Sequence, residues 1–232
     1  EQITQAILAA ATPRTRLALI SQVTSPSGII LPIADLVAPL EARGIQTVID
    51  GAHAPGFTPR ADLNTLNPSY YTANCHKWMC TPKGSCFLYV RRDRQKDFRP
   101  WCLSNNANKP KASRKHYLTE FDFIGTLDHT AFLAIPAGIR TMETMVEGGW
   151  PQIMRRNREL TIKARDLLCR ALNVQAPAPD SMIGCLSTIF LPQHDPDRTK
   201  RLLARPSKYH DALQDILVHK HRIQVPLWSI AG

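Results

Sequence analysis

Short apolar runs recur through the first half of this 232-residue chain, and amphipathic segments separate them. The runs lie at 17–20, 45–49, 70–73 and 86–90. They are rich in leucine, β-branched and aromatic residues, as strands are. The run at 17–20 is apolar throughout, which predicts a buried strand. Strands that alternate with helical segments predict an α/β fold with a mostly parallel sheet.

The segment 32–43 has the apolar spacing of a helix that packs on a sheet. One helical face collects Ile33, Leu36, Val37 and Leu40. Gly44 follows this segment, and glycine is the commonest residue just beyond a helix end. We therefore expect a helix between the first two strands.

The second half of the chain has a different pattern. We expect helices at 130–146, 152–172 and 207–218, and strands at 187–191 and 222–230. Two adjacent glycines, at 148 and 149, allow a break between helices. The sequence therefore predicts that 1–148 belongs to a large domain and 149–232 to a smaller α+β domain.

The chain carries 29 Lys and Arg against 19 Asp and Glu, a formal net charge of +10. Nine of the basic residues lie in 91–115, which we expect to be a solvated loop. Nucleic-acid surfaces interleave such charge with aromatic residues, and none lies between Trp101 and Tyr117, so we expect no nucleic-acid partner. No apolar run approaches the roughly 20 residues of a membrane-spanning helix, so we expect no membrane partner.

The six cysteines include no Cys-x-x-Cys pair. Cys75 and Cys80, with His76 between them, lack the second paired cluster of a zinc site, so we expect no metal. A chain of this length folds without disulfides, and a reducing, cytoplasmic setting is the simplest expectation.

Polar residues follow two of the expected strands, at the edge where ligands gather in open α/β sheets. Asp50 follows the run at 45–49, and 74–77 follows the run at 70–73. An aspartate, then His53 and then Lys77 suit a site for a protonated pyridine ring, in which a carboxylate pairs with the ring nitrogen and an amine forms a Schiff base. Each residue alone also has an ordinary explanation: a turn cap, a structural histidine or a solvated lysine.

Several longer motifs occur in one order along the chain. They are Ser21 to Pro32, Val48 to Gly56, Tyr71 to Trp78, Pro82 to Gly84 and Phe123 to Asp128. In this order they resemble the class V aminotransferase family of pyridoxal-phosphate enzymes, and they are most similar to its isopenicillin N epimerase-like branch. The resemblance covers nearly the whole chain and implies the aspartate aminotransferase-like architecture called fold type I.

The resemblance implies a role for each matching residue. Lys77 would hold pyridoxal 5′-phosphate as a Schiff base, and Asp50 would keep its pyridine nitrogen protonated. His53 would contact the cofactor ring, and Ser25 would reach its phenolic oxygen.

The phosphate of the cofactor would be bound from two places. His76 and Asn74 match positions that bind it within the same subunit. Gly125 and Thr126 match a pair that reaches the phosphate of the neighbouring subunit, which implies a homodimer with a shared active site. Taken alone, Gly125 and Thr126 would be read as an ordinary turn before the helix at 130.

The resemblance leaves the reaction and the substrate open. An epimerase, an aminotransferase and a lyase would all act at the Cα of an amino-acid-like substrate, and an epimerase needs a second acid that the sequence does not identify. The alternatives are a C–S lyase or cysteine-desulfurase-like enzyme, or a truncated non-catalytic homologue that serves in binding or dimerisation. Gln22 stands where the family commonly has a histidine, which puts a substrate contact there in doubt. The family's ring-stacking aromatic and carboxylate-binding arginine find no match, so we expect a chain that is incomplete at both ends.

Overall fold

The structure is a computed structural model that describes residues 1–59, 61–108, 113–192, 195–208 and 211–228. Its helices, 3₁₀ turns (η) and strands follow in the order α1 (Gln2–Ala10), β1 (Leu17–Ser21), α2 (Ile33–Ala42), β2 (Gln46–Asp50), α3 (Leu63–Leu66), β3 (Tyr70–Asn74), β4 (Cys86–Val90), η1 (Arg92–Arg94), η2 (Asn105–Asn108), α4 (His116–Asp122), α5 (Thr130–Leu133), α6 (Ile135–Glu143), α7 (Gly149–Leu172), η3 (Asp180–Met182), α8 (Pro196–Leu203) and α9 (Ala212–His221).

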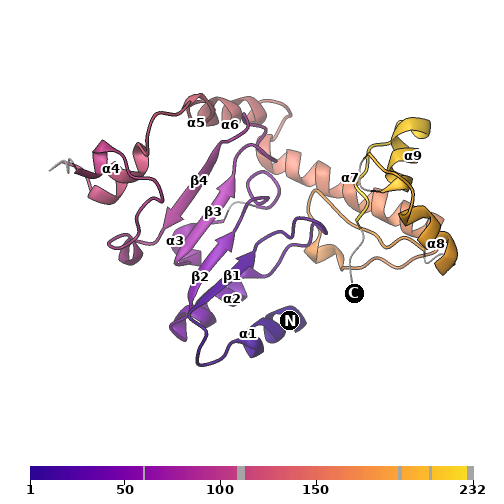
Figure 1. The fold of residues 1–232 in the computed structure, drawn as a ribbon, viewed down its shortest axis with the longest axis horizontal. Helices are drawn as coiled ribbons and strands as arrows, with labels where there is room; N and C mark the ends of the chain where they lie inside the picture. Colours follow the sequence, from indigo (N-terminus) through magenta and orange to yellow (C-terminus); the bar gives the residue numbers. More distant parts are fainter. Residues whose placement is uncertain (60, 109–112, 193–194, 209–210, 229–232) are drawn as a thin grey trace. The chain divides into compact units, whose positions relative to one another are not determined.

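In the described residues the strands form one sheet in the order β1-β2-β3-β4 (Figure 1). The first three strands run parallel to one another, whereas β4 is antiparallel to β3. The mostly parallel α/β sheet expected from the sequence is therefore confirmed. Each of the four expected strands lies within a residue or so of its predicted position.

The core lies between the sheet and α2. Leu36, Val37 and Leu40 of α2 are almost fully buried, and they cluster with Ile20 and Ile49 of the sheet. Complete burial of a leucine or valine side chain stabilises a fold by about 1.5–3 kcal/mol. The helix face that the apolar spacing predicts is therefore the one that covers the sheet.

The expectation that β1 is a buried strand holds for one of its faces and is wrong for the other. Leu17 and Leu19 are 51% and 70% exposed, whereas Ile20 is 5% exposed. Side chains alternate between the two faces of a strand, and only the face that carries Ile20 is covered by α2. An apolar run shows that a strand can be buried, but the neighbouring elements decide which of its faces is covered.

The second half departs from expectation in several places, and the helix expected at 207–218 is observed as α9, Ala212–His221. The helix expected at 130–146 is divided into α5 and α6, and Pro136 lies in the first turn of α6, where proline is well tolerated. The expected strands at 187–191 and 222–228 are absent from the described residues, and 229–230 lie outside them. Arg222 ends α9 in a left-handed conformation (φ 57°), which turns the chain out of the helix. β-rich sequence forms a strand only where a partner strand is available.

Two compact units divide the chain. The first comprises Glu1–Ala164 with Ala178–Ser187 and contains the sheet, and the second comprises Arg165–Pro177 with Thr188–Gly232. The domain boundary at 148–149 stays a prediction.

No helix in the described residues is long and apolar enough to cross a membrane. All six cysteines are free thiols.

Candidate functional site

The candidate site lies at the carboxyl edge of the three parallel strands. Asp50 ends β2 and Asn74 ends β3. In the register of the sheet, Ser21 of β1 lies beside Asp50, and Asp50 lies beside Thr72. The sheet therefore brings the segments after β1, β2 and β3 to one edge.

A tight turn after β2 orients Asp50. The amide of Ala52 donates to Asp50 Oδ1 over 2.9 Å. Gly51 is buried in this turn, and a Cβ atom there would lie 2.3 Å from the hydroxyl oxygen of Tyr71. Only glycine leaves room for that close approach, so this residue sets the path of the chain after Asp50.

A buried hydrogen bond joins Tyr71, whose hydroxyl lies near Gly51, to Gln22. The Tyr71 hydroxyl donates to Gln22 Oε1 over 2.7 Å, and Gln22 is 6% exposed. Burial, together with the Asp50 charge, raises the pKa of Tyr71 to about 12, so the phenol stays protonated. This hydrogen bond joins β3 to the segment directly after β1.

Lys77 and His53 lie close together. Lys77 Nζ lies 3.1 Å from His53 Nε2, although the two residues are 24 positions apart. On the other side of the ring, the Trp78 indole N–H donates to His53 Nδ1 over 3.3 Å. We call these three residues the Lys77 cluster.

The electrostatics of the Lys77 cluster favour a neutral imidazole. Burial and the nearby Lys77 charge lower the pKa of His53, and the Asp50 carboxylate acts in the opposite direction. His53 therefore lies within the fields of both Asp50 and Lys77. A carboxylate, an imidazole and an amine are thus close enough to interact electrostatically.

The expected phosphate-binding residues, Asn74 and His76, contact the hairpin that β3 and β4 form. Asn74 pairs with Cys86 across the two strands. His76 Nδ1 lies 2.9 Å from the carbonyl oxygen of Ser85. Since a carbonyl oxygen only accepts, Nδ1 carries the hydrogen, and Nε2 is the ring nitrogen left for another group.

Three predicted site residues lie outside the hydrogen bonds of the Lys77 cluster: Ser25, Gly125 and Thr126. Ser25 is exposed in the turn after β1, which the Gly28 amide closes by donating to the Thr24 carbonyl over 2.8 Å. Gly125 (φ 134°) and the exposed Thr126 lie between α4 and α5. Within the described part of the chain, none of the three is hydrogen-bonded to the cluster.

The contacts of Trp78 and Tyr71 are not predicted from the sequence. Both residues belong to the motif Tyr71 to Trp78, and Tyr71 also belongs to the strand expected at 70–73. The position of Trp78 directly after the lysine was a signal, because an indole there can contact the residues around Lys77. Nothing in the local sequence pairs Tyr71 with Gln22, which lies 49 positions away.

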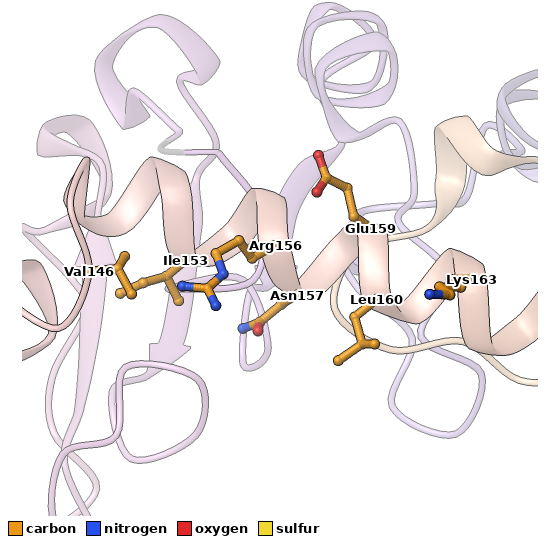
Figure 2. Close-up of a pocket in the computed structure, with 7 residues that line it drawn as sticks. All are labelled: Val146, Ile153, Arg156, Asn157, Glu159, Leu160 and Lys163. Carbon is orange, nitrogen blue, oxygen red and sulfur yellow. The ribbon is translucent and has the colours of Figure 1, made fainter.

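A concavity of about 470 Å³ lies along α7 (Figure 2). Val146 and six residues of α7 line it: Ile153, Arg156, Asn157, Glu159, Leu160 and Lys163. None of them belongs to the candidate site.

Across the described residues, no group of three or more His, Cys, Asp or Glu side chains could hold a metal ion.

Comparison with solved structures identifies the fold. The apo cysteine desulfurase of Thermococcus onnurineus NA1 aligns with a TM-score of 0.65 at 18% sequence identity, over 87% of this chain and 50% of that one. The architecture is the fold type I of pyridoxal-phosphate-dependent enzymes, in agreement with the sequence.

Sequence comparison then identifies the family. The model for aminotransferase class-V matches residues 1–207, and the chain belongs to this family. It is 38% identical over 190 residues to the isopenicillin N epimerase of Streptomyces clavuligerus, a match that covers 78% of this chain and 47% of that protein. It is 29% identical over 221 residues to an Arabidopsis thaliana protein named "Probable L-cysteine desulfhydrase, chloroplastic", with 93% and 43% covered. The chain spans about half the length of these curated relatives.

Class V aminotransferases use pyridoxal 5′-phosphate. The donor set at the sheet edge fits this cofactor. A carboxylate suits a protonated pyridine nitrogen, an amine suits the aldehyde, and imidazole and backbone N–H donors suit a phosphate. Asp50, Lys77 and His76 are the side chains that supply these groups here.

Proposed function

We propose that this chain carries the cofactor-binding part of a pyridoxal-phosphate-dependent enzyme that acts at the Cα of an amino-acid-like substrate, as an isopenicillin N epimerase-like protein. One observation carries the proposal: Lys77 Nζ lies 3.1 Å from His53 Nε2. The Asp50 carboxylate also acts electrostatically on the His53 ring. A solvated lysine and a chance histidine would not be brought together over 24 positions at the edge where α/β sheets bind ligands.

Each residue has a role in this proposal. Lys77 would hold the cofactor covalently, Asp50 would keep its ring nitrogen protonated, and His53 would contact its ring. When bound, the cofactor supplies an electron sink for charge that develops at the substrate Cα. Once a substrate amine has replaced it on the cofactor, the freed Lys77 Nζ would be the base that takes the proton from that carbon.

The remaining predicted residues complete the cofactor site. Asn74 and His76 bind the phosphate from the same subunit, and Ser25 serves the phenolic oxygen. Gly125 and Thr126 reach the phosphate of a second copy, so the proposed enzyme is a homodimer. The free thiols fit a reducing compartment such as the cytoplasm.

Return of the proton to the opposite face of Cα would complete an epimerisation and needs a second acid. Loss of a sulfur substituent from Cβ would make the enzyme a C–S lyase. Similarity to a protein named as a desulfhydrase favours this second candidate. The proton taken by Lys77 Nζ is common to both reactions.

A cysteine desulfurase needs an accessible nucleophilic thiol, and Cys185 does not fit that role. The Cys185 thiol is half-buried and donates to the Phe57 carbonyl over 3.6 Å. Burial raises the pKa of Cys185 to about 11, so little thiolate is present at neutral pH. A non-catalytic homologue would keep the fold without binding the cofactor productively.

The proposal is tested by mixing the purified chain with pyridoxal 5′-phosphate, recording the absorption spectrum, reducing with borohydride and locating the modified lysine by peptide mass. We expect a yellow species and reduction onto Lys77. Lys77→Ala should abolish both, whereas Lys83→Ala, at an exposed lysine six residues away, should leave both unchanged. Labelling that is spread over surface lysines would contradict the proposal.

If Lys77 is modified, the next measurement separates the two reactions. Exchange of the α-proton with loss of optical activity indicates an epimerase. Release of sulfide and a keto acid from cysteine indicates a C–S lyase.

A further inference from the structure

The turn that carries His53 is compact and is closed by its own backbone. The Ala54 amide donates to the Gly51 carbonyl over 2.8 Å. The Ala54 carbonyl accepts from the amides of Phe57 and Thr58, each over 3.0 Å. Ala54, Phe57 and Thr58 are all buried. His53 lies inside this turn, so the position of the turn sets the position of the imidazole.

Gln22 is bonded to this turn at both of its ends. At the start of the turn, the Gln22 backbone amide donates to the Asp50 carbonyl over 2.8 Å. At its end, Gln22 Nε2 donates to Thr58 Oγ1 over 3.4 Å, and that hydroxyl donates to the Ala54 carbonyl over 3.3 Å. Both Gln22 and Thr58 are buried, so water does not compete for these bonds.

The same side chain is also fixed to β3. Gln22 Oε1 accepts from the Tyr71 hydroxyl over 2.7 Å. A terminal amide has one acceptor atom and one donor atom, so it can serve Tyr71 and Thr58 at once. β3 leads into the segment that carries Lys77, whose Nζ lies 3.1 Å from His53 Nε2. The Gln22 amide therefore joins the turn of His53 to the strand that precedes Lys77.

We propose that Gln22 is a positioning residue that ties the turn of His53 to β3 and so holds the imidazole beside Lys77. Gln22 acts through Thr58 and Tyr71, because its amide is bonded to both. A neutral amide does not ionise, so the tie itself does not titrate. Its part in catalysis rests on the proposed function, whereas the tie needs no cofactor.

The test compares two glutamines that each accept from a tyrosine hydroxyl. Gln22→Met removes the buried amide and keeps an unbranched side chain. Gln46→Met is the matched control, because Gln46 accepts from Tyr70 over 3.1 Å but lies at the start of β2, at the end away from the turn. Thr58→Val removes only the hydroxyl that joins Gln22 to the turn and leaves the Tyr71 bond in place, so it decides the matter if Gln22→Met does not fold.

Hydrogen exchange and the pKa of His53 are measured by NMR on the full 232-residue chain without cofactor, and His53→Gln assigns the imidazole signals. Relative to the amides of α2, the Phe57 amide should exchange about fivefold faster in Gln22→Met and in Thr58→Val, the change expected for loss of one neutral hydrogen bond. Burial and the Lys77 charge lower the pKa of His53, and the Asp50 charge opposes them. As the turn loosens, this pKa should rise toward its ordinary value of 6.5.

Gln46→Met should leave both readings unchanged. An unchanged His53 pKa in folded Gln22→Met or Thr58→Val overturns the proposal, even if the variant is less stable, because the amide would then support only the fold. Equal changes in Gln46→Met overturn it too. Failure of the unmutated chain to bind pyridoxal 5′-phosphate would overturn the proposed function and leave the positioning result standing.

Discussion

Tyr71 shows how one buried hydroxyl supports the candidate site. It is 3% exposed and its partner Gln22 is 6% exposed, so water cannot replace the bond between them. The neighbouring Tyr70 makes a similar bond, over 3.1 Å, to Gln46 Oε1, but both of these residues are only partly buried. The two tyrosines therefore form a natural pair for comparison.

We expect Tyr71→Phe to lower the free energy of unfolding by about 1–3 kcal/mol, because it leaves Gln22 Oε1 buried without its donor. Tyr70→Phe should cost less than about 0.5 kcal/mol, because Gln46 can turn to water. Urea unfolding of the two variants measures the difference. Equal losses in both variants would show that burial of the Gln22 bond does not matter.

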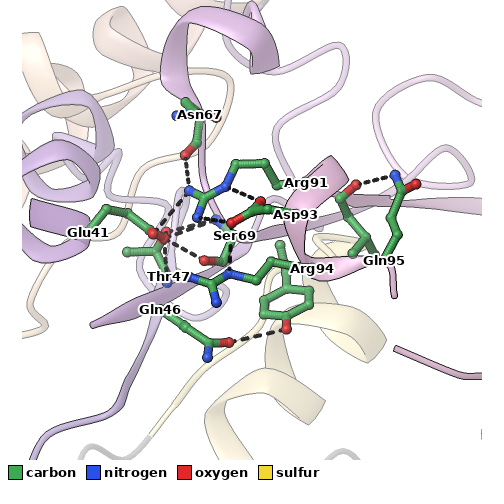
Figure 3. A network of polar contacts seen from close by, with 11 residues as sticks. Glu41, Gln46, Thr47, Asn67, Ser69, Arg91, Asp93, Arg94 and Gln95 are labelled. Atoms are coloured by element: carbon green, nitrogen blue, oxygen red, sulfur yellow. Dashed lines mark hydrogen bonds and ion pairs between the residues drawn. The ribbon is translucent and has the colours of Figure 1, made fainter. Parts of the chain in front are cut away.

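At the scale of elements, Glu41 joins α2 to the sheet (Figure 3). One of its oxygens, Oε1, accepts from the Thr47 amide (2.9 Å) and hydroxyl (2.6 Å) and from the Ser69 amide (3.0 Å) and hydroxyl (2.7 Å). Its other oxygen accepts from Arg91 over 3.0 Å. The basic segment at 91–115 is therefore not all solvated loop as expected, because Arg91 is largely buried in this ion pair.

Burial raises the pKa of Glu41, but the hydrogen bonds from Thr47, Ser69 and Arg91 together outweigh it and leave the pKa below its ordinary value of 4.5. A carboxyl group whose pKa is lowered by folding stabilises the folded state above its unfolded pKa. That stabilisation is lost as the pH falls through the folded value. Glu41 therefore contributes most at neutral pH.

We expect Glu41→Gln to lower the free energy of unfolding by about 2 kcal/mol at pH 7, because hydrogen bonds to a charged group are lost. The difference from the unmutated chain should shrink as the pH falls below about 4.5. Denaturant unfolding at several pH values measures it, with the exposed Glu159→Gln as a control that should change stability by less than about 0.5 kcal/mol. A difference that is constant with pH would contradict this role of the Glu41 charge.

At the scale of the whole molecule, the proposed homodimer can be tested by complementation. Lys77→Ala and Thr126→Ala should each reduce the cofactor that borohydride traps on Lys77. If Thr126 serves the neighbouring subunit, co-expression of the two variants should restore about a quarter of the sites, because half of the dimers are mixed and each has one intact site. Trapping no greater than the average of the two single variants would contradict a shared site.

The four strands of the sheet could be predicted because each is a short apolar run bounded by polar residues or glycine. The strand expected at 187–191 and the described part, 222–228, of the strand expected at 222–230 are absent for a physical reason. Strand formation is completed by hydrogen bonds to a partner, and a local sequence does not reveal whether that partner is within reach. The antiparallel direction of β4 likewise depends on how the chain turns between Asn74 and Cys86.

The sequence by itself determined the α/β class, which strands are followed by polar residues, and the residue types of the candidate site. These features follow from period and spacing along the chain, which are local properties. Only the tertiary structure decided that Lys77 meets His53, that Trp78 holds the far side of that ring and that Tyr71 bonds to Gln22. These contacts join residues 24 to 49 positions apart. They form because the sheet register and the packing of α2 bring separate strand ends to one edge, which local sequence does not encode.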